Sequence, residues 1–358
     1  MKRIRVYEKL ISDKNLEEAI KMVCRSHKWV HYPDKPNKTV IWLESDIPER
    51  VIALRKMIEN GFEPSETIKK KRFDNNAGKW REISEPKIWP DQCVHHALIQ
   101  VLEKTMMRGM DHWCCGSIKG RGAHYGARAI KKWRKKNKEK WCVELDIRHF
   151  YDSLSPDVVM ARMKQLLKDH RTLDLIERIT REGIQIGAYC SQWLANTFLQ
   201  PLDQLIRTMA DRYLRYMDNF TIFTRTKKAA AKIIEAVRLW LKDHGLELKG
   251  NWQKFRVSKR HPNALGYRFG KGYTLLRKKS LLRLRRQLRR FYRMRERGRF
   301  IPVRFAQGLL SRMGMLRHCN SVKIYTEIPR HTQRKLKNII REEAKRWSIA
   351  LEPNASMV

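Results

Sequence analysis

Two aspartates that lie far apart in the sequence are each set in an apolar segment. Asp146 comes near the end of Trp141–Ile147, and Asp218 lies within the aromatic and β-branched segment Tyr213–Phe223. Burying a carboxylate at the end of a strand costs free energy unless a cation lies beside it. In phosphoryl transfer this cation is usually a divalent metal, which offsets triphosphate charge and activates the attacking hydroxyl. Either acid by itself is more simply a cap or half of a salt bridge, so the prediction depends on the pair.

The elements around the two acids are predicted in the order strand, helix, helix, hairpin. The apolar run before the first acid is predicted as a central strand, and Ser155–Arg181 and Ser191–Arg207 as helices. Tyr213–Phe223 is predicted as two strands joined by a tight turn, with Asp218 and Asn219 at the tip. This order fits a ferredoxin-like sheet, in which the strand end and the hairpin tip can meet.

The residues before the first acid divide into a helical part and a basic part. Helical periodicity around Leu16–Cys24 and Glu49–Asn60 predicts a helical N-terminal extension over residues 1–65. Ile68–Phe73 and Lys79–Ser84 flank turn-forming residues and predict a β-hairpin with basic arms. Such a hairpin could lie on phosphates or simply be solvated.

Three further segments connect this hairpin to the strand of the first acid. Pro90–Lys104 suits a helix and leads into the Gly-rich basic loop Gly116–Gly122, after which another helix begins near His124. The loop could approach a triphosphate closely, although Gly-rich basic loops are common. Lys131–Lys140 is almost wholly charged, and we expect it to be a solvated connection.

The composition points to a nucleic-acid partner. The 358 residues carry a formal charge of +41, far more than solubility needs, and 42% hydrophobic residues argue against disorder. The start is charged, and no window approaches the roughly 18 apolar residues of a membrane span. We therefore expect a cytoplasmic protein with no membrane contact. The seven cysteines form no Cys-x-x-Cys pair and predict reduced thiols, and Cys93, His95 and His96 lack the second ligand pair of a zinc site.

Several segments in order resemble the motifs of reverse transcriptases. Asp146–Asp152 resembles motif A, Tyr216–Asn219 resembles the Tyr-x-Asp-Asp of motif C, and Ile186–Gln192 is similar to motif B. With Ile first and Ser-Gln last, motif B resembles that of diversity-generating retroelement enzymes within the group II intron-like bacterial and phage reverse transcriptases. Retroviral and group II intron enzymes usually read Gln-Gly-x-x-x-Ser-Pro there.

The outer motifs extend the resemblance over most of the chain. Arg81–Pro86 with His95–Ala97 resembles motif 1, Ile118–Arg121 motif 2, Leu246–Gln253 motif D, Leu265–Arg268 the motif E primer grip, and Ser311–Tyr325 the thumb. Several motifs in the order and at the spacing of a family are strong evidence of membership, whereas any one of them alone is weak evidence. The resemblance implies an α+β right-hand polymerase with fingers, ferredoxin-like palm and helical thumb. The implied boundaries are 1–65 for the N-terminal helical extension, 66–270 for fingers and palm, and 271–358 for the basic thumb and C-terminal region.

The resemblance also implies the catalytic roles. Asp146 and Asp218 would hold two Mg²⁺ ions, which Mn²⁺ could replace, and the backbone carbonyl of Ile147 would lend a further oxygen. Tyr151 stands at the steric gate, a ring that blocks a 2′-hydroxyl, unless it is only a core aromatic. Asn219 departs from the family, which has a second Asp there; an amide can bind a metal through oxygen but brings no charge. In motif D, Gln253 and Lys254 straddle the expected general-acid lysine, whose role stays unassigned.

The implied binding residues fall into two groups. Cations of the fingers would hold the triphosphate, and motif B would line the template and nucleotide pocket, although Ser191 could equally be a helix N-cap. These residues are Arg81, Lys119, Arg121, Gly187, Ser191 and Gln192. Arg277–Arg299 predicts an amphipathic basic helix that tracks the phosphates of an RNA–DNA hybrid. The primer grip and this helix contribute Leu265, Gly266, Tyr267, Arg268, Arg277, Lys278, Arg285, Arg286 and Arg289.

The sequence leaves three functions open. The first is an RNA-directed DNA polymerase of a diversity-generating retroelement, which takes deoxynucleoside triphosphates and a template RNA. The resemblance adds a basic oligomeric accessory protein and a structured non-coding RNA as partners. The second is a defence-associated reverse transcriptase that acts against phage. The third is a catalytically impaired RNA-binding scaffold, because motif C reads Tyr-Met-Asp-Asn.

Overall fold

The structure is a computed structural model that describes residues 6–28, 37–74, 79–136, 138–321, 324 and 328–351. It contains two compact units. The first unit comprises Met1–His27, Lys38–Gly126 and Glu139–Arg260, and the second comprises Lys28–Asn37, Ala127–Lys138 and His261–Val358. Helices and antiparallel sheets occur in both units, so the α+β class is confirmed. The division at residues 65 and 270 stays a prediction.

Four helices form the N-terminal part of the first unit: α1 (Val6–Leu10), α2 (Asp13–His27), α3 (Lys38–Ser45) and α4 (Ile47–Glu59). The buried positions of α2 recur at helical spacing, and this face packs on α4 and on α5 (Cys93–Arg108). The side chain of Asp46 accepts from the Glu49 N–H at the start of α4, and Gly61 follows its end with φ +82°. The predicted helical character of this part is confirmed for its described residues.

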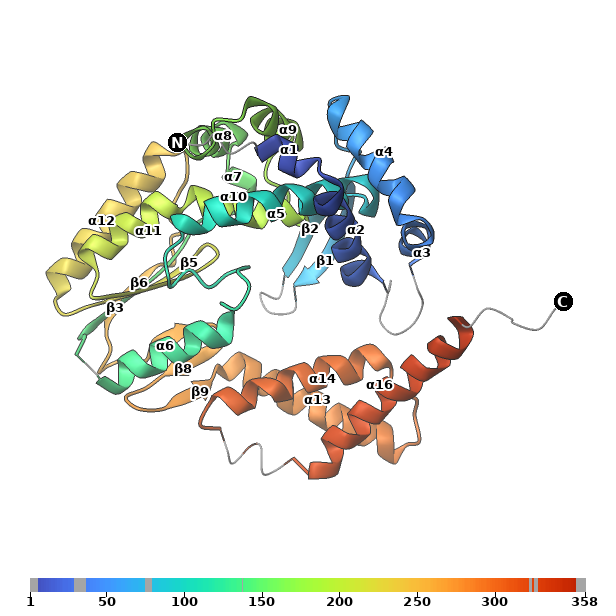
Figure 1. Cartoon of the computed structure of the whole chain (residues 1–358). Coiled ribbons are helices and arrows are strands. Elements are labelled where there is room, and N and C mark those ends of the chain that lie inside the picture. The colour runs from blue at the N-terminus through green and yellow to red at the C-terminus, as the bar shows by residue number, and fades with distance from the viewer. Residues whose placement is uncertain are drawn as a thin grey trace. The chain divides into compact units, whose positions relative to one another are not determined.

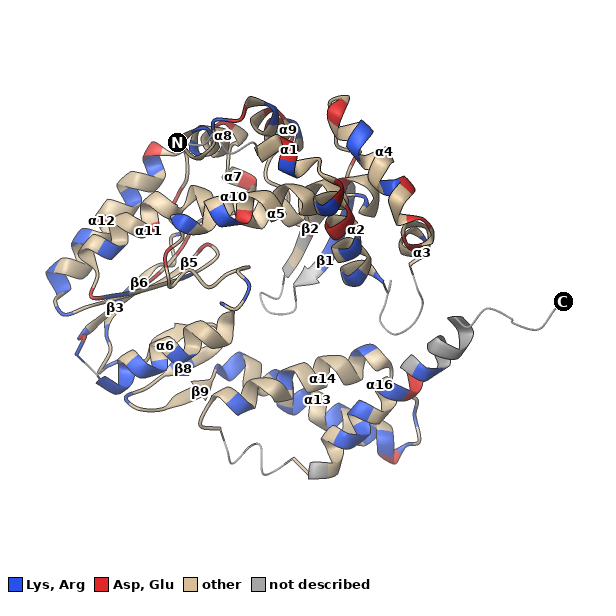
Figure 2. Cartoon of the chain, viewed as in Figure 1, with Lys and Arg blue, Asp and Glu red and all other residues tan. Residues whose placement is uncertain are grey.

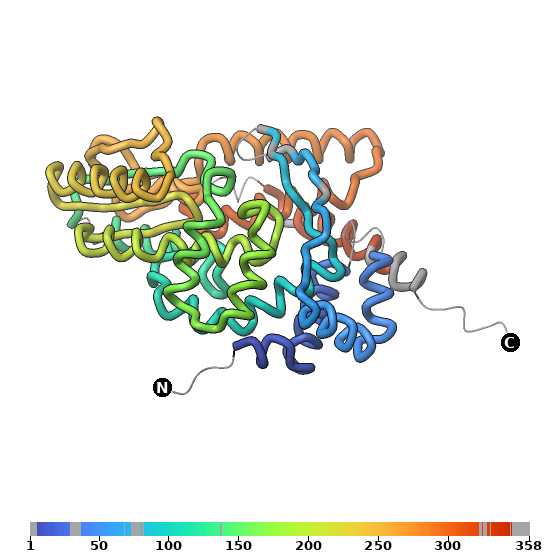
Figure 3. Tube along the Cα trace, turned by 90° about the horizontal axis from the view of Figure 1, so that it is seen from above, coloured from blue at the N-terminus to red at the C-terminus, as the bar shows by residue number. Residues whose placement is uncertain are grey.

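The predicted hairpin is present as β1 (Ile68–Asp74) and β2 (Lys79–Glu85), which pair antiparallel with Ile68 opposite Glu85. In Figure 3 the two strands run side by side as light-blue tubes. The turn residues 75–78 lie outside the described residues. A π-helical turn, η1 (Ile88–Gln92), then leads into α5.

The first unit contains a four-stranded antiparallel sheet (Figure 1). Its strands are β3 (Trp141–Asp146), β4 (Arg212–Tyr216), β5 (Asn219–Thr224) and β6 (Gln253–Arg256), in the spatial order β4-β5-β3-β6. Helices connect β3 to β4, and α12 (Lys227–Asp243) connects β5 to β6. This is the connectivity and strand order of a ferredoxin-like sheet. Helices α11 and α12 pack on the sheet, whose buried residues join one core with the N-terminal helices.

Both long helices predicted between the acids are wrong in one respect, because each is broken into two. After the short α7 (Phe150–Ser153) come α8 (Pro156–Leu166), α9 (His170–Thr180), α10 (Tyr189–Phe198) and α11 (Gln200–Met209). Leu167 is extended, and the Asp169 carboxylate accepts from the Thr172 N–H to begin α9. Pro201 has no N–H and its ring clashes with the preceding turn, which ends α10.

The second unit contains α6 (Ala123–Lys136, whose first residues belong to the first unit), a three-stranded sheet and a group of helices. The strands are β7 (Asn263–Ala264), β8 (Tyr267–Phe269) and β9 (Thr274–Leu276), and the helices are α13 (Lys278–Glu296), α14 (Val303–Met315), η2 (Leu316–His318) and α16 (Arg330–Leu351). Lys and Arg crowd α6 and α13 (Figure 2).

Two predictions about the basic segments need correction. Lys131–Lys140 is helical as far as Lys136 rather than a connection, and Trp133 and Arg134 are buried in it. Helix α13 is amphipathic as predicted, but Leu282, one of the apolar residues that recur at roughly helical spacing within Arg277–Arg299, is exposed. Within the described ranges, none of the helices has both the length and the apolar character that a bilayer crossing needs.

Candidate active site

The end of β3 and the tip of the β4–β5 hairpin meet. Asp146 lies opposite Asn219 in the antiparallel register, and the Ile147 N–H donates to the Asp218 carbonyl at 3.3 Å. Side chains of directly opposed residues share one face of a sheet, about 5 Å apart at Cβ. The Asn219 Nδ2 donates to Asp218 Oδ1 at 2.8 Å. The structure therefore brings together the two acids and the amide that the sequence placed at one site.

The carboxylate of Asp146 already has a cation beside it. Lys249 Nζ lies 2.8 Å from Asp146 Oδ2, and its backbone N–H donates to the Asp146 carbonyl at 2.9 Å. Gln253 and Lys254 are opposite Glu144 and Val143, further back along β3. Sequence reasoning missed Lys249 because it looked for a lysine at the end of motif D rather than at its centre.

A buried ion pair stands behind the hairpin tip. Arg215 and Asp203 are both fully buried, and Nε and Nη2 of the guanidinium each donate to one carboxylate oxygen at 2.7 Å. The Tyr213 hydroxyl donates to the same carboxylate. Arg215 Nη1 donates to the Asn196 side-chain oxygen at 2.7 Å and to the Met217 carbonyl at 3.1 Å. Met217 has φ +57°, so this network holds a strained residue next to the second acid.

Tyr151 lies close enough to Asp218 to feel its charge, and it is hydrogen-bonded to a residue of motif B. Its hydroxyl donates to Gln192 Oε1 at 2.9 Å, and the Ser117 hydroxyl reaches the same oxygen at 3.2 Å. Burial raises the pKa of the Tyr151 hydroxyl, and the negative charge of Asp218 raises it further. The phenol is therefore a neutral donor at physiological pH.

Two glycines allow loops to approach the site closely. A Cβ on Gly116 would lie 2.7 Å from the Met217 nitrogen. Gly187 has φ +122°, and a Cβ there would lie 2.5 Å from the Ser84 carbonyl oxygen. The Ser84 N–H donates to the Ile186 carbonyl at 3.0 Å, so β2 pairs with the turn that precedes α10. Both positions require glycine for steric reasons.

The predicted triphosphate cations are placed unequally. Lys119 is exposed, whereas Arg121 is half-buried and donates to the Asp111 carbonyl at 2.9 Å. Arg81 lies in β2 opposite Arg72, and its side chain is outside the described residues.

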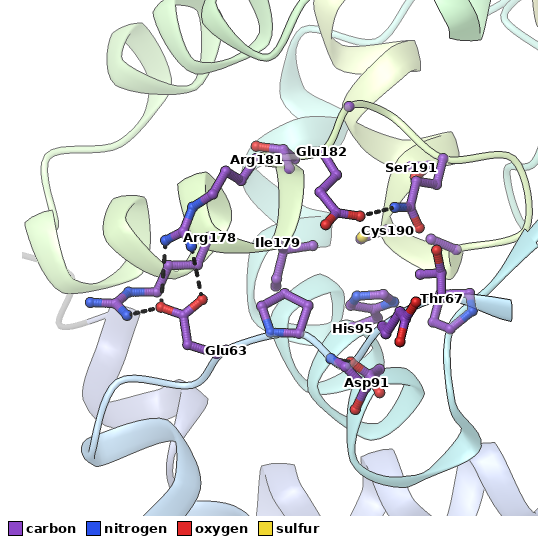
Figure 4. A pocket seen from close by; sticks show the side chains of 18 residues that line it. Glu63, Thr67, Asp91, His95, Arg178, Ile179, Arg181, Glu182, Cys190 and Ser191 are labelled. Carbon is purple, nitrogen blue, oxygen red and sulfur yellow. Dashed lines mark hydrogen bonds and ion pairs between the residues drawn. The ribbon is translucent and has the colours of Figure 1, made fainter.

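Ser191 lines a cavity of about 210 Å³ (Figure 4). It is the third residue of α10, whose N-cap is Ala188, so the N-cap alternative for Ser191 is wrong. His95 and Asp91 also line this cavity. Both are buried, and within the described part of the chain His95 Nδ1 and Asp91 Oδ2 have no hydrogen-bond partner. Burial lowers the pKa of His95 to about 3, and the neighbouring His96 lowers it too.

The predicted primer-grip residues lie in the second unit. Leu265 and Gly266 form a turn with φ +53° and +87°, and Arg268 is exposed. The Tyr267 ring is buried, and its hydroxyl donates to the Met315 carbonyl at 3.1 Å. Arg277 donates to Asn263. The remaining predicted residues, Lys278, Arg285, Arg286 and Arg289, are exposed on α13.

The oxygen donors at the site suit a hard divalent cation. Carboxylate oxygens of Asp146 and Asp218 are the ligands that Mg²⁺ prefers. Among the described residues no group of three or more His, Cys, Asp and Glu side chains could hold a metal ion. Mg²⁺ commonly takes its remaining oxygens from water and substrate phosphates, so a pair of acids is compatible with a site that is completed by a nucleotide.

Comparison with known proteins places the chain in a family. Residues 68–269 match the family described as reverse transcriptase (RNA-dependent DNA polymerase). The match covers more than half of the chain, which therefore belongs to the reverse transcriptase family. RNA-directed DNA polymerisation is the activity of this family.

Two curated proteins are similar to the chain. Protein YkfC of Escherichia coli is 22% identical over 316 residues, which cover 74% of this chain and 81% of YkfC. An uncharacterized 91 kDa protein in the cob intron of Schizosaccharomyces pombe is 26% identical over 194 residues, which cover 50% of this chain and 23% of that protein.

Telomerases are among the similar solved structures. Apo telomerase from Candida tropicalis has a TM-score of 0.48 at 11% identity, over 79% of this chain and 57% of that one. Telomerase from Candida albicans, in complex with a fragment of telomeric RNA, has a TM-score of 0.49 at 10% identity, over 77% and 54%. This chain thus spans little more than half of each telomerase chain.

Proposed function

We propose that this protein is an active RNA-directed DNA polymerase that copies a template RNA into complementary DNA by two-metal phosphoryl transfer. The observation that carries the proposal is the pairing of β3 with β5, which puts Asp146 opposite Asn219 and next to Asp218. Family membership supplies the reaction class, and the two acids supply the oxygen ligands that the reaction needs.

Each residue near the acids then has a task. Asp146 and Asp218, with the backbone carbonyl of Ile147, would hold the ions, and bound Mg²⁺ would stabilise charge on the attacking and leaving oxygens. Tyr151 would close the sugar side of the nucleotide pocket. Lys249 is our candidate for the general acid that motif D left unassigned, because its ammonium already lies at the carboxylate of Asp146.

The remaining parts take the roles of a right-hand polymerase. We assign the ferredoxin-like sheet to the palm, the β1–β2 hairpin and the Gly116–Gly122 loop to the fingers, and α13 and α14 to the thumb. The exposed arginines of α13 would track the backbone of an RNA–DNA hybrid through salt-dependent contacts with phosphates. Lys119 and Arg121, with Arg81, would meet the triphosphate of the incoming deoxynucleotide.

The biological role that we propose is that of a diversity-generating retroelement enzyme. It is supported by Ile186 at the start of motif B and Ser191-Gln192 at its end. Such an enzyme would act with a basic oligomeric accessory protein and a structured non-coding RNA. A defence-associated enzyme would share the chemistry, and the gene neighbourhood separates the two: a template and variable repeat pair marks the retroelement, and a defence cluster marks the antiphage role.

A second candidate, an RNA-binding scaffold without catalysis, is favoured by one observation. Asn219 brings no charge, and its amide nitrogen donates to Asp218 Oδ1, which takes up part of the binding capacity of that acid. Together with the ammonium of Lys249, this leaves the corner of the sheet with less negative charge than three carboxylates would give.

Primer extension on an RNA template with Mg²⁺ or Mn²⁺ separates the two candidates. We expect incorporation by the protein, more by Asn219→Asp and none by Asp146→Ala. Asp243→Asn, an exposed acid at the end of α12, serves as the matched control and should behave as the unchanged protein. Background incorporation by all variants would refute the polymerase and favour the scaffold. Incorporation by Asn219→Asp alone would mean an intact pocket that lacks one charge.

A further inference from the structure

We propose that Gln192 is a positioning residue that anchors the Tyr151 ring, and that this anchor sets the discrimination between deoxy- and ribonucleotides. The inference rests on the proposed polymerase function. Its first support is the hydrogen bond of 2.9 Å from the Tyr151 hydroxyl to Gln192 Oε1. Its second is the 3.2 Å hydrogen bond from the Ser117 hydroxyl to the same oxygen.

Three separate elements meet in this contact. Tyr151 lies in α7, directly after the strand of the first acid, Gln192 lies in α10, and Ser117 lies in the Gly-rich loop. The loop is fixed in turn, because the side-chain nitrogen of Asn196 donates to the Gly116 carbonyl at 2.9 Å. Gln192 therefore links the tip of the ring to α10 and, through Ser117, to a loop that is itself hydrogen-bonded to α10.

A ring that excludes a 2′-hydroxyl must resist being pushed aside. The Tyr151 ring is half-buried, and its Cβ end is fixed by the backbone of α7 and the neighbouring Phe150 ring at 5.3 Å. Its hydroxyl end is held by Gln192. Removing that hydrogen bond lets the ring turn about its side-chain bonds at lower cost, so a ribose meets less resistance.

Gln192 also occupies a position with chemical meaning in the motif. Enzymes that read Gln-Gly-x-x-x-Ser-Pro have proline there, and proline has no side-chain acceptor. In this chain the acceptor oxygen at that position faces the phenol. The geometry thus points to a gate that is anchored by motif B itself.

The test measures kcat/KM for dGTP and for GTP in single-nucleotide extension on an RNA template. Both nucleotides carry the same base and triphosphate, so their ratio isolates the sugar. We expect Gln192→Leu and Tyr151→Phe each to lower the dGTP preference about 3- to 10-fold, the range of one net hydrogen bond. The double variant should fall no further than either single variant, because both remove the same contact. Gln192→Glu keeps an acceptor and should restore most of the preference.

Controls keep folding and catalysis apart from the anchor. Gln204→Leu changes an exposed glutamine of α11 and should leave the ratio unchanged. Binding of dGTP and GTP to the protein with primer and template in Ca²⁺ gives the same ratio without turnover. A protein that binds both nucleotides with this preference but incorporates neither refutes the polymerase activity and leaves the anchor in place.

Two results would overturn the anchor. One is an unchanged ratio in Gln192→Leu, in kinetics or in binding, while Tyr151→Ala lowers it. The other is an additive loss in the double variant, because additivity means that the two side chains act independently.

Discussion

Breaking the Arg215–Asp203 pair should lower the free energy of unfolding of the first unit far more than breaking an exposed ion pair. Arg215→Met removes the guanidinium and leaves the Asp203 carboxylate with the hydrogen bond from the Tyr213 hydroxyl, in a site with no exposed surface. The carboxylate then keeps the cost of leaving water without its compensating charge.

The size of the effect follows from burial. Both side chains of the pair have an exposed fraction of 0%, and removing one partner of such a pair typically costs about 3–5 kcal/mol. Arg238→Met is the matched control, because Arg238 pairs with Glu235 at exposed fractions of 51% and 57%. An exposed pair of this kind contributes less than about 1 kcal/mol.

Urea unfolding followed by far-UV circular dichroism measures both losses. The double variant Arg215→Met/Asp203→Leu should recover much of the stability that the single variant loses, because no unpaired charge remains. A loss below about 1 kcal/mol in Arg215→Met, equal to that of Arg238→Met, would refute the reasoning. A double variant that loses more stability than its two single variants lose together would also refute it.

Three further outcomes are expected. Gly187→Ala should lower the free energy of unfolding, measured by thermal unfolding, by at least about 2 kcal/mol, because a φ of +122° is strained for alanine and a backbone oxygen lies 2.5 Å from the new Cβ. Gly245→Ala, whose new Cβ meets no atom within 4 Å, should cost less. Lys249→Met should tighten Mn²⁺ binding without nucleotide, measured by electron paramagnetic resonance, by up to about 5-fold, because the ammonium competes for Asp146; unchanged affinity would contradict this. The unchanged protein should lose stability as the pH falls from 7 to 4.5, because the folded-state pKa of His95 is lowered to about 3 and only the unfolded chain takes up a proton there. His95→Gln lacks this loss, so its free energy of unfolding should rise by roughly 2 kcal/mol relative to that of the unchanged protein over this range. Parallel curves of stability against pH would contradict the prediction.

The sequence predicted the convergence of the two acids because apolar runs and a turn are local patterns. Asp146 and Asp218 end segments whose strand character can be recognised without knowing their partners, and an antiparallel sheet then brings their ends together. The hairpin of β1 and β2 and the helix α5 were predicted for the same reason.

The residues that sequence reasoning missed depend on long-range register. Nothing local shows that Lys249 pairs with the end of β3 rather than with solvent, since that depends on how the segment after α12 returns to the sheet. Arg215 has the side chain of a surface residue, and its burial depends on Asp203 lying on a helix that packs behind β4. The break before α11 was visible as Pro201 and should have been predicted.

At the hairpin tip, the residues that stabilise the fold differ from the residue that sets the charge offered to a cation. The architecture depends on Arg215 and Asp203, which are sealed in the interior, whereas Asn219 is exposed. An exchange at position 219 can therefore change the charge offered to a cation with little cost in folding. The codons for asparagine and aspartate differ by a single base. A single mutation at this position can therefore weaken or strengthen cation binding in a lineage that carries this fold.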